Sequence, residues 1–282
     1  MTQIRVDTTG LLRSIVIAAA VSAVVLATAS PLSAQWLNYP TAGAARLPSG
    51  LPNLSAPAPM TADGRPDLSG IWQPETTRRC PPEGCFDMLA GEQFFNIGWG
   101  LKDGLPYRAW AADARKVRMS ENGKDDPVSH CLPGGVVKLH TTPLLRKIIQ
   151  IPGLVVSLNE MDATYRQIFT DGRPLPVDPQ PSWKGYSSGK WDGDTLVVET
   201  NGFRDGLWLD RSGSPMTDGA VMTERFRRVN YGTLEIEITV DDPKAYTAPW
   251  TVKVNQFIVL DTDLLDYVCQ ENEKDGKHLV GR

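Results

Sequence analysis

The most constraining feature of the sequence is a strict alternation of apolar and polar residues in short segments. It is clearest at residues 233–240, TLEIEITV, where Leu234, Ile236, Ile238 and Val240 alternate with polar side chains. Side chains of a β-strand point to opposite faces in turn. One face of this segment is therefore predicted to be buried and the other to meet water.

Similar short segments, separated by turn sequences, fill the chain from residue 136 onward. Turns such as TDGRP, WDGDT and NYGT contain residues that tolerate a positive φ angle, which favours antiparallel hairpins over βαβ crossovers. The sequence therefore predicts an all-β fold, an antiparallel barrel or sandwich. The other strand candidates are LSGIWQ (68–73), VVKLH (136–140), RKIIQI (146–151), LVVSLNE (154–160), TYRQIFT (164–170), TLVVET (195–200), VMTERFRRV (221–229), WTVKVNQFIVL (250–260) and DYVC (266–269).

Two further segments have a different character. Residues 35–68 are dense in Pro, Ala, Gly and Ser and show no apolar period, so we expect a proline-rich linker or strap. The stretch 86–120 is the helix-like part, and Arg108 to Met119 contains good helix formers. The predicted organisation is one β domain at 69–282 with a helical insertion at about 86–120.

The first 34 residues have the pattern of a secretory signal peptide. Arg5 and Arg13 precede an alanine-rich apolar run that ends at Ala29, and small residues surround a cleavage site near Ala34. An uncleaved anchor is the weaker alternative, because this run is marginal for a bilayer that needs about 20 apolar residues. The sequence predicts a periplasmic or secreted protein with no membrane span after cleavage.

Removal of these 34 residues from the 282 leaves 248, enough to bury a core as one domain. The removed segment contains two arginines and one aspartate, so the formal net charge changes from −4 to about −5. This acidic balance argues against a nucleic-acid partner, since such proteins usually present a basic face.

Four cysteines remain after cleavage, and an even number in an oxidising compartment indicates disulfides. Of three possible pairings we favour Cys80 with Cys85, which flank a PPEG turn, and this choice leaves Cys131 with Cys269. A metal or redox site is the alternative, but a four-residue spacing fits neither a thioredoxin-like motif nor a usual zinc knuckle.

The letters GYSSG at 185–189 match the G-x-S-x-G pattern of a hydrolase nucleophile elbow. An elbow holds its serine on a strand-to-helix turn, whereas Ser187 lies between a proline-rich stretch and another strand candidate, and the one later histidine is His278. We interpret the motif as part of a strand whose small residues allow a bend or close packing.

No metal and no cofactor is predicted. His130, His140 and His278 lack the spacing of metal ligands, and a tight turn accounts for Asp192 and Asp194.

Charged residues on apolar faces are the main candidates for a site. Glu160, Arg166 and Glu224 each share strand parity with apolar neighbours, so each must find a partner or a solvated cavity if its face is interior. For these charged residues, a structural ion pair and a contact with a ligand are equally supported interpretations.

Aromatic residues are candidate pocket walls, with core packing as the alternative. They are Trp72, Trp183, Trp191, Trp208, Trp250, Tyr165, Tyr186 and Phe203.

A motif series covers most of residues 61–273: DGRPDLSGIW, HCLPGG, IFTDGRPLP, GYSSGKWDGDTLVVETNGF, TERFRR, VDDPKAYTAPWTV and DYVCQE. In this series the chain resembles a widespread group of uncharacterised secreted bacterial proteins, and the resemblance implies no activity. The G-x-W of Gly70 to Trp72 is similar to the first strand of lipocalins and other calycin barrels. Thr262, Asp263 and Tyr267 are similar to the lipocalin T-D-x-x-x-Y element, but they lie too close to the C-terminus for the usual last strands and helix.

These observations together predict an antiparallel lipocalin-like barrel that holds a small apolar or aromatic molecule. The expected ligand-binding residues are Glu160, Arg166, Arg173, Tyr165, Trp191, Trp208 and Glu224. The alternative is a barrel enzyme of the lyase, hydratase or isomerase type, with Glu160 or Glu224 as acid or base. Arg166 or Arg173 would stabilise developing negative charge, and His140 would be a reserve proton carrier. A second alternative is an envelope protein–protein interaction module that adds an edge strand or the strap to a partner.

Overall fold

The computed structural model describes residues 40–75, 96–98, 100–269 and 271. These residues belong to one compact unit, Pro40–Arg282. The predicted signal peptide, the Cys80–Cys85 pair and His278 lie outside them.

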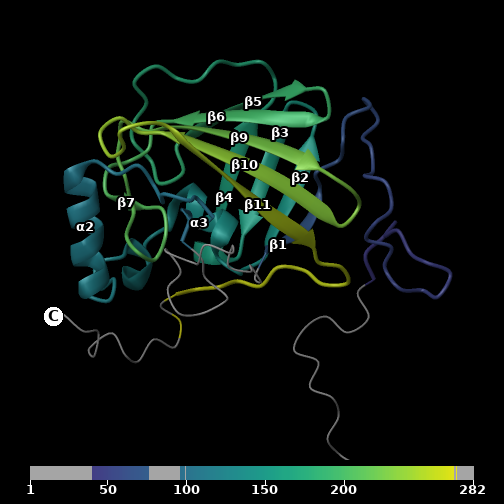
Figure 1. Cartoon of the computed structure of the whole chain (residues 1–282). Coiled ribbons are helices and arrows are strands. Elements are labelled where there is room, and N and C mark those ends of the chain that lie inside the picture. The colour runs from purple at the N-terminus through teal and green to yellow at the C-terminus, as the bar shows by residue number, and fades with distance from the viewer. Residues whose placement is uncertain (1–39, 76–95, 99, 270, 272–282) are drawn as a thin grey trace, which may run out of the picture. The chain divides into compact units, whose positions relative to one another are not determined.

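Nine strands form a closed barrel in the order β1-β11-β10-β9-β6-β5-β4-β3-β2 (Figure 1). This confirms the predicted all-β barrel. A separate two-stranded sheet pairs β7 (Leu207–Trp208) with β8 (Pro215–Met216). The barrel strands are β1 (Gly70–Pro74), β2 (Arg146–Ile151), β3 (Leu154–Asn159), β4 (Thr164–Phe169), β5 (Tyr186–Asp192), β6 (Thr195–Asn201), β9 (Val221–Arg228), β10 (Thr233–Asp241) and β11 (Trp250–Ile258).

One neighbouring pair, β4 with β5, is parallel, and the other barrel pairs are antiparallel. The proline-rich connection at 170–185 loops out and brings the chain back beside the last residues of β4, where Ile168 and Phe169 pair with Ser187 and Ser188, so β5 runs in the same direction. Short turns such as Gly193–Asp194 join the hairpins. Such turns cannot make a parallel pair, which needs a longer connection.

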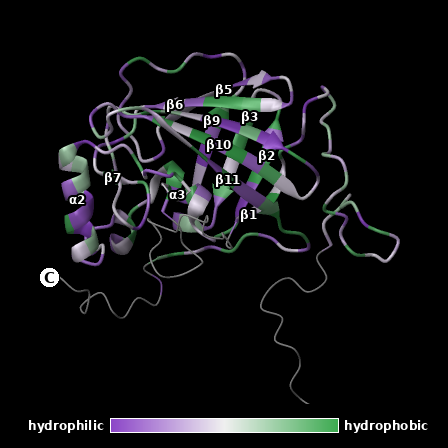
Figure 2. Ribbon diagram, viewed as in Figure 1, coloured by the Kyte–Doolittle hydropathy of each residue, from purple (hydrophilic) through white to green (hydrophobic). Residues whose placement is uncertain are grey.

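Alternating side chains fill the barrel. The apolar residues of β10, from Leu234 to Val240, are completely buried, as their alternation predicts. Figure 2 shows hydrophobic and hydrophilic residues interspersed along the strands. Trp72 is also fully buried; its Nε1 donates to the Leu68 carbonyl at 3.0 Å, and the Arg228 guanidinium lies 4.9 Å from its ring centroid.

The predicted helix at 108–119 is confirmed as α2 (Ala109–Ser120). The segment VVKLH is not a strand but part of α3 (Gly135–Thr141), a short helix that is buried at every residue. DYVC is also wrong as a strand, since residues 266–269 form no ladder. The described residues also include two 3-10 helices. The first, η1 (Pro127–His130), lies between α2 and α3, and the second, η2 (Met161–Ala163), lies between β3 and β4.

The described part of the predicted strap, 40–68, makes specific backbone contacts with the barrel. The amides of Tyr231 and Gly232 donate to the carbonyls of Ala56 and Leu54 at 2.8 Å. Arg46 forms an ion pair with Asp261 at 2.7 Å.

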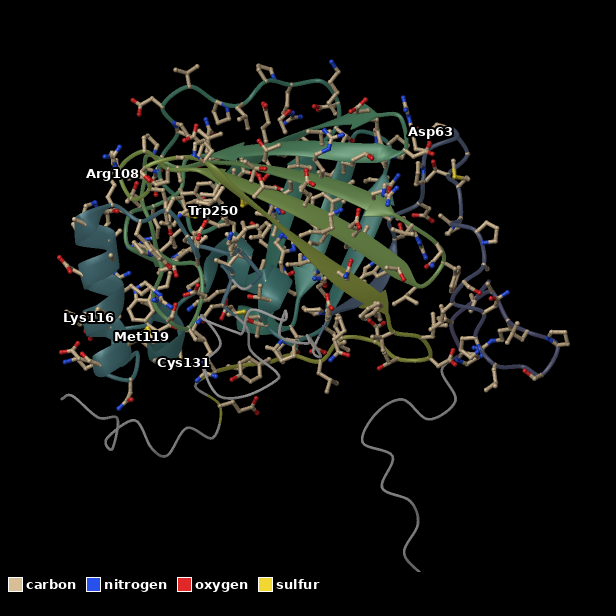
Figure 3. The ribbon with its side chains drawn as sticks, viewed as in Figure 1. Asp63, Arg108, Lys116, Met119, Cys131 and Trp250 are labelled. Carbon is tan, nitrogen blue, oxygen red and sulfur yellow. A yellow bond between two sulfur atoms is a disulfide. The ribbon has the colours of Figure 1, made fainter. Side chains whose placement is uncertain are left out.

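The disulfide Cys131–Cys269 is confirmed and joins cysteines 138 positions apart (Cys131 is labelled in Figure 3). It attaches the segment after β11 to the C-cap of η1. Lys147 and Asp263, which pair at 3.0 Å, hold the same segment against β2.

Candidate functional site

A buried cluster of charged residues lies inside the barrel. Arg166 on β4 and Glu224 on β9 form an ion pair, in which both guanidinium Nη atoms donate to the carboxylate. The Glu224 side chain is 0% exposed and that of Arg166 is 5% exposed. The faces that Arg166 and Glu224 share with apolar neighbours are therefore interior, and the two residues are partners.

His140 of α3 extends the cluster. Its Nε2 lies 2.6 Å from Glu224 Oε1, and its Nδ1 lies 2.8 Å from Nη1 of Arg146 on β2. Because an arginine can only donate, Nδ1 must be the acceptor, and Nε2 therefore carries the proton that is donated to Glu224. The contacts assign His140 as a neutral imidazole.

The electrostatics of the cluster agree with this assignment. Burial lowers the pKa of His140 to about 4, with the Arg146 charge acting in the same direction and the hydrogen bond to Glu224 opposing it. Burial alone would raise the pKa of Glu224, but Arg166 and the hydrogen bonds lower it to about 2. Burial lowers the pKa of Arg146 to about 9, which leaves it charged at neutral pH.

Ser187, the serine of GYSSG, belongs to this cluster and not to a nucleophile elbow. It lies within β5, and its hydroxyl accepts from Arg166 Nε and Nη2 at 3.2 and 3.0 Å and contacts Thr200 Oγ1 at 3.0 Å. The glycines of the motif serve close packing: a Cβ on Gly185 would lie 2.5 Å from the Asn201 carbonyl oxygen. This agrees with the interpretation of GYSSG as a closely packed strand.

The space left beside the cluster is small. Arg146, Arg166 and Ser157 line an internal cavity of about 20 Å³ together with apolar side chains. Single small-molecule sites usually need about 300 Å³ or more. This cavity, as the described residues enclose it, is therefore too small for the aromatic molecule that the sequence suggested.

Glu160 does not join the cluster. Its parity partners Val156 and Leu158 face outward, because the buried residues of β3 are Val155, Ser157 and Asn159. The Glu160 carboxylate accepts instead from the amides of Leu145 and Leu265, both at 3.0 Å. It fixes the segment after β11 to the start of β2.

The other predicted ligand-binding residues are dispersed. Tyr165 is 65% exposed. Arg173 is exposed, pairs with Asp171 at 2.6 Å and lines a pocket of about 300 Å³ with Tyr186 and the neighbouring prolines. Trp191 lies under Arg65 at 5.9 Å, and Trp208 is buried beside Arg118 at 4.6 Å.

A larger cavity of about 340 Å³, here called the α3 pocket, lies on the side of α3 that carries Lys138 and Thr141. Met161, Leu144 and Tyr267 give it apolar walls. Its lining is Asp126, Val128, Ser129, Lys138, Thr141, Thr142, Pro143, Leu144, Met161, Asp162, Asp210, Arg211, Tyr267 and Cys269.

Lys138 and Asp126 form a buried ion pair in the wall of this pocket. The Nζ atom lies 2.5 and 2.6 Å from the two carboxylate oxygens and 5.7 Å from the Trp208 ring centroid. Burial lowers the pKa of Lys138, and the Asp126 charge opposes this shift. The sequence does not single out this lysine, because it lies within VVKLH, whose composition favours a strand.

Asp162 is the second notable group of the α3 pocket. Its backbone is left-handed, with φ at 64°, and Oδ2 accepts from the Gly134 amide at 3.0 Å. Burial raises the pKa of Asp162, and this hydrogen bond opposes the rise. Left-handed backbone outside glycine costs energy, even for aspartate, and often marks functional sites.

Together these features define a closed β-barrel protein with a filled, charged interior and a separate pocket beside its buried helix. No protein-family model matches the chain, and no curated protein matches it. In the part of the chain that the structure describes, no helix is long and apolar enough to cross a membrane, and no group of three or more potential ligand side chains is placed to hold a metal ion.

The interior cluster predicts acid sensitivity. The folded pKa of His140, about 4, is below its ordinary 6.5, so the unfolded chain binds a proton that the folded chain rejects. Stability is thus expected to fall as pH decreases from about 6.5 to 4, by on the order of 3 kcal/mol. Glu224 adds a further loss between its ordinary 4.5 and about 2.

Urea midpoints between pH 7.5 and 4 measure this loss. His140→Gln removes the titrating imidazole but keeps a donor and an acceptor, so we expect a flatter profile between pH 6.5 and 4. His130→Gln, at an exposed histidine of η1, is the matched control and should keep the wild-type slope. An unchanged slope in His140→Gln would contradict the assignment.

Proposed function

We propose that the protein binds a small apolar or aromatic molecule carrying a hydrogen-bond donor, and that the molecule occupies the α3 pocket. The observation that carries the proposal is this cavity of about 340 Å³, in which apolar walls surround a few convergent polar groups. The barrel core, with its cavity of about 20 Å³, serves as the rigid support.

The charges of the pocket favour a donor group on the ligand. Lys138 is already neutralised by Asp126. The Asp210 carboxylate accepts from Ser212 and Ser214 at 2.8 and 2.7 Å. Asp162 receives one backbone hydrogen bond and keeps further acceptor capacity, so an amine or hydroxyl of the ligand is its natural partner.

The predicted periplasmic or secreted location stays part of the proposal. The Cys131–Cys269 disulfide supports it, because such bonds persist in oxidising compartments.

Acid–base catalysis in the same pocket is a second candidate function. Asp162, whose pKa is raised, and Lys138, whose pKa is lowered, are shifted in the directions that suit a general acid and a general base near neutral pH. Glu224 and His140 do not suit this role, because their contacts are made within the closed interior. Turnover with a pH profile that changes in Asp162→Asn would favour this candidate over simple binding.

The proposed binding is tested with the protein purified under native conditions and analysed by native mass spectrometry, beside a denatured sample. Tyramine and 4-ethylphenol are then compared as probes by ligand-observed NMR, since they share an aromatic body and only tyramine carries an amine. We expect saturable binding, tighter for tyramine.

Asp162→Asn should weaken tyramine binding by about tenfold, the effect of losing one charge-assisted hydrogen bond. Asparagine tolerates the left-handed backbone and can still accept from Gly134, so the fold should be preserved. Asp192→Asn on β5, whose carboxylate is 70% exposed, is the control. Absence of saturable binding, or equal affinities in Asp162→Asn and wild type, would refute the proposal.

A further inference from the structure

The interior cluster carries an excess of positive charge. Arg146 and Arg166 are cationic, Glu224 is anionic, and the contacts of His140 require a neutral ring. These four groups therefore sum to one positive charge, although each side chain is almost or completely buried. A buried charge without a counter-charge is costly, so a compensating group is expected nearby.

Two buried donors without a partner belong to Arg146, one of the two cations. Arg146 uses Nη1 for His140, whereas its Nε and Nη2 have no hydrogen-bond partner among the described residues. These two atoms form one edge of the planar guanidinium, the edge that commonly binds an anion through two parallel hydrogen bonds. Arg166 differs, because all of its nitrogens are engaged by Glu224, Ser187 and Thr200.

The cavity beside these residues fits one small particle. Its volume of about 20 Å³ exceeds the roughly 10–15 Å³ needed for a single water-sized occupant and excludes polyatomic anions such as sulfate. Its polar lining side chains are Arg146, Arg166 and Ser157; the others are apolar.

The lining chemistry distinguishes an anion from a water molecule. A water molecule that accepts from the Arg146 donors must donate its own two hydrogens to acceptors. Among the lining side chains only Ser157 Oγ can accept, since its own hydrogen is donated to Asn159. A monatomic anion needs no acceptor, and it also neutralises the excess charge.

We infer that the barrel interior holds a monovalent anion of halide size, bound by the Nε and Nη2 edge of Arg146 beside Arg166 and Ser157. Physiological chloride has this chemistry. The site is independent of the α3 pocket: it is a structural counter-ion, enclosed when the barrel closes.

Bromide gives a direct test. The wild-type protein is unfolded in urea, refolded in sodium bromide or in sodium gluconate at equal ionic strength, and crystallised from bromide. We expect an anomalous bromide peak in the cavity within hydrogen-bond distance of Arg146 Nε and Nη2. Electron density there without an anomalous signal would identify water and overturn the inference.

A second measurement uses stability in solution. The urea midpoint should rise with bromide or chloride concentration and saturate, while gluconate leaves it unchanged. Arg146→Met should abolish the halide dependence. Arg225→Met, at a more exposed arginine of β9, should retain it. Equal midpoints in halide and gluconate for the wild type would overturn the inference without relying on any variant.

Discussion

Glu224→Gln is expected to destabilise the protein by about 3–5 kcal/mol, the usual cost of removing one partner from a buried ion pair. The carboxylate oxygens accept from His140 and from both Nη atoms of Arg166. A glutamine amide must place its NH₂ group at one of these positions, where it faces a donor. Rotation of the amide by about 180° only places the NH₂ group against a different donor.

A change of the His140 tautomer does not relieve this conflict either. It would direct a proton on Nδ1 towards Arg146 Nη1, which is itself a donor at 2.8 Å. The variant would also leave the two arginines without a negative charge from the protein.

Urea unfolding at pH 7.5 measures the effect. Glu199→Gln on the adjacent strand β6 is the matched control, because Glu199 is exposed, and it should change stability by less than about 0.5 kcal/mol. The double variant Glu224→Gln/Arg166→Met should cost less than the sum of the two single changes, since it removes both members of the pair. A loss below 1 kcal/mol in Glu224→Gln would contradict the geometry.

Removal of the disulfide by Cys131→Ser/Cys269→Ser is expected to cost on the order of 5 kcal/mol. The bond closes a loop with a sequence separation of 138, and the chain-entropy model assigns about 4.7 kcal/mol to a 100-residue loop. The effect should appear as a lower urea midpoint. It should also increase proteolytic cleavage between Val259 and Cys269.

The two single cysteine variants provide the internal control. Each removes the same cross-link, so each should cost nearly as much as the double change. Blocking of the remaining thiol prevents new pairings. A double variant with wild-type stability and wild-type resistance to proteolysis would show that the ion pair Lys147–Asp263 and the Glu160–Leu265 hydrogen bond hold this segment without the disulfide.

The fold was largely predictable in segments where buried and more exposed residues alternate along the chain. The alternation in β10 requires a two-faced strand, and the turn sequences specify hairpins. VVKLH was misassigned because five residues do not distinguish a buried strand from a buried helix. Its β-branched valines favour a strand locally, but packing against β7 and β11 outweighs that weak preference.

The site was predictable only in part. Parity grouped Arg166 and Glu224 with apolar neighbours but left open which faces are interior. The same rule applied to RKIIQI would have grouped Arg146 with Ile148, which lie on the buried face of β2. For Glu160 the face shared with Val156 and Leu158 is the outer one, since β3 carries apolar residues on both faces. The α3 pocket combines residues from η1, α3, η2 and the segment after β11. These elements are distant in sequence, so no local sequence pattern could predict the pocket.

Closure of the barrel has a consequence for folding kinetics. β1 pairs with β11, so that Trp72 lies opposite Ile258, and the ring is complete only when the last strand is available. Proteins dominated by such distant contacts fold slowly. The interior charges, contributed by α3, β2, β4 and β9, must therefore lose their hydration late in the reaction, and barrel closure is expected to be the rate-limiting step.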